Sequence, residues 1–293
     1  MKQVFGSLPQ GSQDRLDPSG GLTSQSAVSR CRLEISLSVT TRKKGNHVMN
    51  NSKPTIVLVH GAFAESASWN GVVERLQAES LNVVAAANPL RSIRGDASYV
   101  RDVVAGIGGP VVLVAHSYGG FVITEAAAGN SLVSSLVYVC AFAPDKGENA
   151  FDLSTKFPGS SLGETLATYR LSTGDSEFAI KQELFHHQFV ADVPASQAAL
   201  MAATQRPVTA AALTEGLPVE TPAWKTIPSW FVFGAEDRTI PAALHRFMAQ
   251  RAGARGVREV AGASHALSVS QPQIVADSIM EAVRATSLAR LPA

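Results

Sequence analysis

A serine in a tight turn between a predicted strand and a predicted helix is the most informative feature of the chain. Ser117 is the third residue of A-H-S-Y-G-G (residues 115–120), which follows the apolar run V-V-L-V. A nucleophile elbow has this order of elements and needs small residues two positions before and two positions after the nucleophile. Ala115 and Gly119 satisfy this need, although the strict pattern has glycine at the first position. We therefore predict that Ser117 is a nucleophile whose Oγ projects from the strand end, beside the positive potential of a helix N-terminus.

An acid and a base follow later in the chain, each directly after a predicted strand. Asp237 comes after Ser229–Gly234, and His265 comes after Val257–Val260. A serine, an acid and a histidine in this order, each at a strand end, are typical of a catalytic triad. We predict that Asp237 orients the His265 imidazole and balances its charge, and that this imidazole takes the proton of Ser117.

The loop after the first predicted strand, H-G-A-F (residues 60–63), could stabilise negative charge. Acyl transfer needs hydrogen-bond donors at the place where an oxyanion develops. The backbone N–H groups of Ala62 and Tyr118 are the candidates for this oxyanion hole. We expect His60 and His116 to hold loops together by hydrogen bonds and to take no direct part in the chemistry.

Other titratable residues have simpler interpretations. Glu236 and Asp145 are rival acids, and Asp237 is favoured over both. The His186-His187 pair has no cysteine or paired carboxylate at ligand spacing, so it does not predict a zinc site. His245 is expected at the surface of its helix. The chain has neither G-x-x-x-x-G-K-[ST] nor G-x-G-x-x-G, so no nucleotide site is indicated, and we expect no metal and no cofactor.

Apolar strands alternate with amphipathic helices from residue 54 onward, which predicts a parallel sheet covered on both faces. Six strands are expected: Thr55–Val59, Val83–Ala86, Val111–Ala115, Leu136–Ala143, Ser229–Gly234 and Val257–Val260. The fold class is therefore α/β, with a doubly wound, mostly parallel six-stranded sheet.

The stretch between Pro144 and Pro228 has helical patches and no evident strand. It is too long for a simple crossover, so we expect a helical cap over the carboxyl ends of the strands, where α/β sheets bind ligands. The predicted organisation is an α/β core in two parts, residues 54–144 and 229–293, with the cap at 145–228.

Residues 1–53 differ from the rest in composition and charge. They hold 8 of the 25 Lys and Arg residues but 3 of the 24 Asp and Glu residues, so the remainder of the chain is net acidic and unsuited to nucleic acid. The segment lacks both a lasting helical period and a signal-peptide core, and we expect a disordered extension. Leu33–Val39 could form a marginal strand, and Met49 is an alternative translation start.

The sequence says less about the cellular compartment and the oligomeric state of the protein. The longest apolar runs fall far short of the ~18 residues that span a bilayer, so a soluble protein with no membrane partner is expected. Two cysteines, Cys31 and Cys140, fit a reducing compartment and hence a cytoplasmic location. Cys140 is expected to be a small buried apolar residue. The sequence leaves open whether the protein forms a homodimer.

Four segments together resemble the α/β-hydrolase superfamily: V-L-V-H-G-A-F, A-H-S-Y-G-G, G-A-E-D-R-T-I-P and A-S-H-A-L-S-V-S-Q-P. With P-A-W-K-T-I-P-S-W (residues 222–230), they resemble the small bacterial esterase-like hydrolases related to plant methyl esterases and hydroxynitrile lyases. The resemblance spans about Lys53 to Ala285. It implies a serine hydrolase without a cofactor, a triad of Ser117, Asp237 and His265, an oxyanion hole from the Ala62 and Tyr118 amides, and a helical cap that shapes the pocket.

Two positions depart from the lyase branch of that family. Hydroxynitrile lyases of this type carry threonine after the motif histidine and lysine after the catalytic histidine, where this chain has Gly61 and Ala266. Without the lysine, no cation is positioned to hold departing cyanide, so hydrolysis of a carboxylic ester is favoured. Aromatic residues in the predicted cap, such as Phe157, Phe178 and Phe185, suggest that this small-molecule ester is apolar. Lactone hydrolysis, perhydrolysis or C–C lysis on the same triad, and a non-catalytic small-molecule receptor, are the alternatives.

A chain that starts at Met49 should fold and melt like the full-length protein, because residues 1–48 lack the apolar surface that offsets backbone ordering of ~1–2 kcal/mol per residue. Thermal unfolding of both chains checks this prediction. If Leu33–Val39 pairs with a sheet edge, the shortened chain should instead lose more than ~2 kcal/mol of stability, a size typical of core damage, or aggregate through the bared edge.

Overall fold

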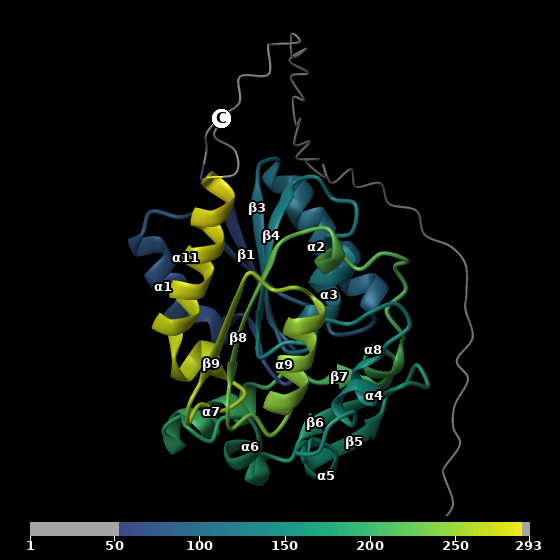
Figure 1. Ribbon diagram of the computed structural model, residues 1–293. Helices are drawn as coiled ribbons and strands as arrows, with labels where there is room; N and C mark the ends of the chain where they lie inside the picture. The colour runs from purple at the N-terminus through teal and green to yellow at the C-terminus, as the bar shows by residue number, and fades with distance from the viewer. Residues whose placement is uncertain (1–52, 289–293) are drawn as a thin grey trace, which may run out of the picture. The chain divides into compact units, whose positions relative to one another are not determined.

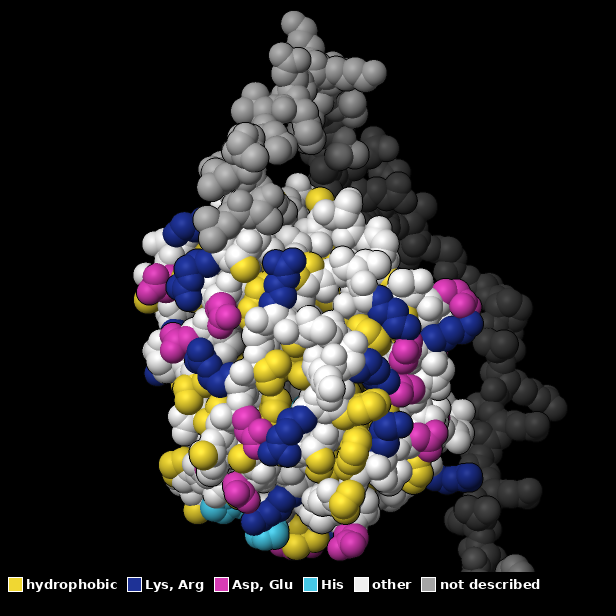
Figure 2. Space-filling model, viewed as in Figure 1, with side chains coloured by type: hydrophobic (Ala, Val, Ile, Leu, Met, Phe, Trp, Pro, Cys, Tyr) yellow, Lys and Arg dark blue, Asp and Glu magenta, His cyan; other side chains and the backbone are white. Residues whose placement is uncertain are grey.

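The computed structural model describes residues 53–288. The expectations for Leu33–Val39, Cys31 and Met49 fall outside these residues. Within the described part of the chain, no helix is long and apolar enough to cross a membrane. Figure 2 shows acidic and basic side chains interspersed on the face viewed, so this face carries no field of one sign.

The core is a six-stranded parallel sheet in the order β2-β1-β3-β4-β8-β9 (Figure 1). Its strands are β1 (Thr55–Val59), β2 (Val83–Ala86), β3 (Val111–His116), β4 (Val133–Val139), β8 (Ser229–Gly234) and β9 (Gly256–Val260). Strands β3 and β8 are buried at every residue, which explains their unbroken apolar sequences. The predicted fold class is confirmed, and the bounds of β4 were wrong at both ends. The strand begins at Val133 instead of Leu136 and ends at Val139, so residues 140–143 leave the sheet although they are apolar.

Helices cover both faces of this sheet. They are η1 (Ser66–Trp69), α1 (Asn70–Ala78), α2 (Ile93–Ile107), α3 (Gly119–Ala126), η2 (Ala223–Lys225), α9 (Ala242–Arg251), α10 (Leu267–Ser270) and α11 (Pro272–Leu288). Helix α1 packs against α11, and α2 packs against α3; in Figure 1 these two pairs lie on opposite sides of the sheet. The sheet is therefore enclosed, and its strand ends are where side chains can reach a ligand.

The segment between β4 and β8 forms a cap, and it is not purely helical. It contains α4 (Ala150–Ser154), α5 (Leu162–Thr165), α6 (Gln182–Phe189), α7 (Ala195–Thr204) and α8 (Ala210–Thr214). It also contains a three-stranded antiparallel sheet of β5 (Leu166–Arg170), β6 (Ser176–Ile180) and β7 (Val208–Thr209). The expectation that this segment has no strand was wrong. Strands β5 and β6 are mostly half-buried or exposed, and the buried strand β7 has only two residues, so none of them has the apolar run that marks the core strands. The sequence held one signal for these strands, the glycine at position 174. It lies in the turn between β5 and β6, and its φ of 95° is a conformation that favours glycine.

The elements at the carboxyl ends of the strands approach one another closely. A Cβ on Gly119 would lie 2.6 Å from the carbonyl oxygen of Val59, at the end of β1. A Cβ on Gly120 would overlap the carbonyl oxygen of Phe142, which belongs to the segment after β4. Helix α3 can therefore start against these two backbones only because its first two residues have no side chain.

Gly120→Ala should lower the free energy of unfolding by at least about 2 kcal/mol, because the backbone of Phe142 cannot move aside without disturbing the core. Gly106→Ala is the matched control. A Cβ on Gly106 meets nothing within 4 Å, and this exposed position within α2 should gain up to ~1 kcal/mol from alanine. Chemical denaturation of both variants measures the difference, and equal stabilities would contradict the packing described.

Candidate active site

Ser117 occupies a strained turn between β3 and α3. Its φ is 53°, a left-handed conformation that is uncommon for residues other than glycine. Backbone hydrogen bonds hold it there: its carbonyl oxygen accepts from Gly120 N at 3.0 Å and from Phe142 N at 3.2 Å, and its N–H donates to Val139 O at 3.4 Å. A strained residue persists only where its surroundings determine it, and here the end of β4 and the start of α3 do so.

The loop after β1 touches this turn. A Cβ on Gly61 would lie 2.5 Å from the Cβ of Ser117 and 3.0 Å from the amide nitrogen of Tyr118. The loop is also tied to the cap, because Phe63 N donates to Arg206 O at 3.0 Å. Ala62, Ser117 and Tyr118 line the same cavity. The structure thus brings Ala62 and Tyr118, the residues of the two candidate oxyanion amides, to the cavity that Ser117 lines.

Tyr118 is held from a second direction by a residue that the sequence analysis did not single out. Its hydroxyl donates to the Oδ2 atom of Asp96 in α2 at 3.0 Å, and both side chains are buried. The two oxygens of Asp96 also accept from Arg91 N at 3.1 and 3.2 Å. Helix α2 therefore fixes the residue that follows Ser117.

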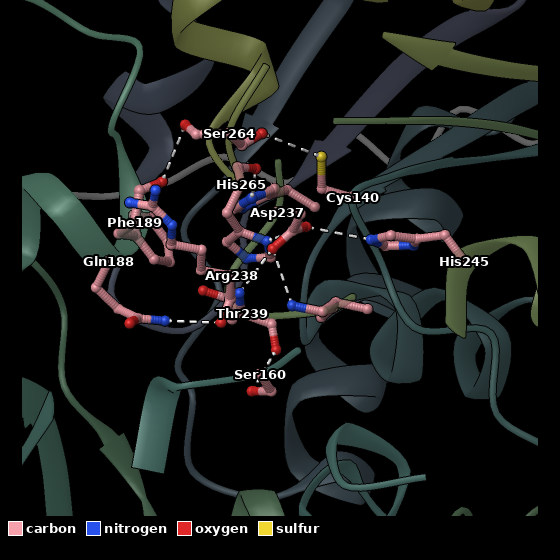
Figure 3. A network of polar contacts seen from close by, with 12 residues as sticks. Cys140, Ser160, Gln188, Phe189, Asp237, Arg238, Thr239, His245, Ser264 and His265 are labelled. Atoms are coloured by element: carbon pink, nitrogen blue, oxygen red, sulfur yellow. Dashed lines mark hydrogen bonds and ion pairs between the residues drawn. The ribbon is translucent and has the colours of Figure 1, made fainter. Parts of the chain in front are cut away.

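The carboxylate of Asp237 bonds to the imidazole of His265. His265 Nδ1 donates to Asp237 Oδ2 at 2.7 Å, and both side chains are fully buried (Figure 3). The other oxygen, Oδ1, accepts from the backbone N–H groups of Thr239 and Ile240 at 2.8 and 2.9 Å. The rival acids lie elsewhere: Glu236 is exposed, and Asp145 pairs with Lys225 at 2.6 Å.

This hydrogen-bonding pattern determines the charge of Asp237. Burial alone would raise the pKa of its carboxyl group, but attraction to His265 and hydrogen bonds from His245 and His265 lower that pKa below its usual range. The ionised carboxylate keeps a proton on Nδ1 of His265. The opposite atom, Nε2, has no hydrogen-bond partner within the described part of the chain, so it has a lone pair with which to accept a proton.

His60 and His116 hold loops together, as predicted. His60 Nδ1 donates to Gly61 O at 2.9 Å, and His116 Nε2 donates to His265 O at 3.1 Å. Burial lowers the pKa of His60 to about 4 and the pKa of His116 well below its usual range, which keeps both rings neutral. The bond from His116 places the backbone of His265 beside the turn that holds Ser117.

His245 is the residue whose position was predicted wrongly. It lies on α9 with 1% of its surface exposed, and its Nε2 is 3.2 Å from Asp237 Oδ2. Its ring stacks on Phe233 with centroids 4.8 Å apart. The available signal was helical spacing, since His245 and Ala249 form a second buried row beside Leu244 and Met248.

Cys140, Asp237 and His265 form the one group within the described residues whose ligand atoms lie close enough for a metal, all within 4.8 Å of one another. Burial raises the pKa of the Cys140 thiol well above its usual value, which disfavours the thiolate that binds metals. Asp237 and His265 already bond to each other. This donor set therefore fits a metal poorly.

Ser117 opens into a cavity of about 440 Å³ between the core and the cap. Most of its lining is apolar: Ala62, Phe63, Tyr118, Phe142, Ala150, Phe151, Phe157, Pro158, Gly159, Leu162, Gly163, Leu166 and Leu213. Hydroxyl groups line the remainder, from Ser117, Ser154, Thr155, Ser160, Ser161 and Thr239. Glu164 is the sole charged residue in this lining, and it is exposed. A second cavity of about 460 Å³, near α1 and α7, shares Phe63 but includes none of the three predicted triad residues.

Comparison with known proteins agrees with this architecture. A family model described as "Alpha/beta hydrolase family" matches residues 56–278. The chain is 27% identical over 254 residues to alpha/beta hydrolase nvfD of Aspergillus novofumigatus, covering 78% of this chain and 96% of that protein.

Solved structures show the same fold. Polyneuridine aldehyde esterase superposes with a TM-score of 0.68 at 20% identity, covering 78% of this chain and 99% of that one. A pyrethroid hydrolase from Sphingobium faniae superposes with a TM-score of 0.62 at 22% identity, covering 79% and 98%. Because the family model spans most of the sequence, from the first strand to the last helix, this chain belongs to the alpha/beta hydrolase family.

Proposed function

We propose that this protein is a serine hydrolase that cleaves carboxylic esters through an acyl-enzyme intermediate. The observation that carries the proposal is the buried 2.7 Å hydrogen bond between Asp237 and His265, next to a serine in a left-handed strand-end turn. Membership of the alpha/beta hydrolase family supports hydrolysis as the reaction class.

In the proposed mechanism, Nε2 of His265 accepts the proton of Ser117 as Oγ attacks the ester carbonyl carbon. The N–H groups of Ala62 and Tyr118 stabilise the oxyanion, and Asp237 stabilises the imidazolium. His265 then protonates the departing alcohol, which leaves an acyl group on Ser117. A water molecule that gives a proton to His265 attacks this acyl group, so the acid departs and Ser117 regains its proton.

The contact between base and nucleophile must tighten when substrate binds. His265 Nε2 has no partner within the described residues, and the ring of His116, the residue before Ser117, lies 4.7 Å from the His265 ring. Such hydrogen bonds are often long or misaligned before substrate arrives. We propose that the bond between Ser117 Oγ and His265 Nε2 forms when substrate binds.

The cavity favours a neutral, apolar ester. Its lining is apolar and hydroxylic, and its single charge is the carboxylate side chain of Glu164, which would repel an anionic substrate. Two structural relatives are named as an esterase and a pyrethroid hydrolase, which is consistent with ester cleavage here.

Cyanohydrin lysis is disfavoured by a steric argument as well as by sequence. The position where the lyases carry threonine is Gly61, and a Cβ there would lie 2.5 Å from Ser117 Cβ, so a side chain does not fit. Ala266, at the position of the lyase lysine, is buried. Lactone hydrolysis, perhydrolysis and C–C lysis on the same residues, and a receptor role, are the alternatives that assays must separate.

Wild-type enzyme should release one equivalent of alcohol per active site in a burst from a chromogenic short-chain ester, and Ser117→Ala should abolish both burst and turnover while the fold is kept. Ser154→Ala is the matched control, because that serine lines the same cavity and donates to Phe151 O; it should keep the burst. A full burst in Ser117→Ala would overturn the assignment of the nucleophile, and binding without turnover in wild type would favour the receptor.

Asp237→Asn should lower kcat for the same ester by on the order of 10⁴-fold, because an amide cannot hold the Nδ1–H tautomer of His265. Glu236→Gln changes an exposed neighbour of Asp237. Its kcat should stay within about twofold of the wild-type value, because surface substitutions usually change free energies by less than about 0.5 kcal/mol. Steady-state kinetics decide the point. Near-normal kcat in Asp237→Asn, with Glu236→Gln or Asp145→Asn inactive, would show that the acid is another residue.

A further inference from the structure

A second histidine reaches the carboxylate oxygen that His265 uses. In Figure 3, dashed lines join Asp237 to His265 on one side and to His245 on the other. Both imidazoles contact Oδ2, at 2.7 Å from His265 Nδ1 and 3.2 Å from His245 Nε2. All three side chains are buried. A triad needs one imidazole on its acid, so the second one requires an explanation.

The surroundings of His245 determine which of its nitrogens carries a proton. Its ring stacks on Phe233 at an interplanar angle of 17°, and its Nδ1 has no hydrogen-bond partner within the described residues. Burial lowers the pKa of His245 despite the neighbouring carboxylate, so the ring is neutral near pH 7. The single proton lies on Nε2, because that nitrogen faces a carboxylate oxygen that can only accept.

The carboxylate of Asp237 therefore accepts four hydrogen bonds, two at each oxygen: from the amides of Thr239 and Ile240 at Oδ1 and from two imidazoles at Oδ2. Four is about the full acceptor capacity of a carboxylate. Each donor stabilises the negative charge and leaves less of it to attract a proton on His265. The shared oxygen is also held from two different elements, α9 and the loop after β9.

From this arrangement we infer that His245 is a positioning residue for the proposed hydrolysis, which fixes the Asp237 carboxylate and extends activity toward acidic pH by weakening the hold of that carboxylate on protonated His265. The inference rests on the proposed function for its kinetic consequence. His245 acts through Asp237, so we assign it no contact with substrate.

Other titratable groups around His245 do not reproduce this effect. Glu259 of β9 attracts it at longer range, but that carboxylate is exposed and paired with Arg246 at 2.8 Å. Cys140, after β4, lies near Asp237 and His265, and burial raises the pKa of its thiol, which keeps it neutral. His116 faces His265 and is kept neutral by burial, which lowers its pKa.

The test compares two variants. In His245→Leu the side chain fills the volume of the imidazole but has no hydrogen-bond donor for Asp237, whereas in His245→Gln the side-chain amide keeps an N–H donor of similar reach. The readout is the pH dependence of kcat/KM, whose acid limb reports the essential base of the free enzyme. In His245→Leu the limb should move to higher pH by about half a unit to one unit, so that activity on the acid limb falls about three- to tenfold. In His245→Gln the limb should stay at the wild-type position.

A second readout makes the inference independent of turnover. In histidine-labelled protein, with seven histidines in the chain, nitrogen NMR follows the titration of His265, assigned by its loss in His265→Gln. The His265 midpoint should rise in His245→Leu and stay in place in His245→Gln. If wild type cleaves no ester, the proposed function fails while this titration still tests the electrostatic role.

If His245 only stabilised the fold, the two variants would give results that differ from this prediction. Both variants would then lower the melting temperature, and neither would move the acid limb or the His265 titration. An unmoved midpoint in folded His245→Leu, a shift to lower pH, or equal shifts in the two variants would overturn the inference.

Discussion

An ionised carboxylate removed from water costs several kcal/mol unless hydrogen bonds replace its hydration. Asp237 meets that constraint through four donors, which come from its own turn after β8, from α9 and from the loop after β9. The parallel pairing of β8 with β9 makes this possible, because it brings the turn of Asp237 and the loop of His265 to the same edge of the sheet. The position and tautomer of His265, and hence the proposed chemistry, depend on this buried charge.

The nucleophile depends on a steric constraint at neighbouring strand ends. Ser117 is kept at a φ of 53° by a turn that only glycine at positions 61, 119 and 120 can pack around. The same contacts bring the amide of Tyr118 beside the loop of Ala62, and Asp96 holds the Tyr118 ring from α2. The cap then closes over this rigid edge and supplies most of the apolar surface of the cavity. A rigid site beneath a variable cap is consistent with a family that shares a fold and differs in substrate.

Much of this could be predicted from the sequence, because its strongest signals are local. Buried parallel strands have unbroken apolar runs, and a nucleophile elbow has a short motif. The six strands and the turn of Ser117 could therefore be predicted, although the bounds of β4 were off by several residues. The missed features depend on contacts distant in the chain. The burial of His245 requires Phe233 and Asp237 beside α9, and the role of Asp96 requires Tyr118. The cap strands pair with each other at partly exposed positions, where apolar runs do not form.

The central claim is that the Asp237–His265 pair activates Ser117, and covalent labelling tests it most directly. A fluorophosphonate reacts with a serine only when a base removes its proton. Peptide mapping by mass spectrometry should find one adduct per chain, on Ser117, and the labelling rate should fall by on the order of 10³-fold or more in folded His265→Ala, as loss of a triad member does. An adduct on another residue, or equal labelling rates with and without the imidazole of His265, would contradict the account.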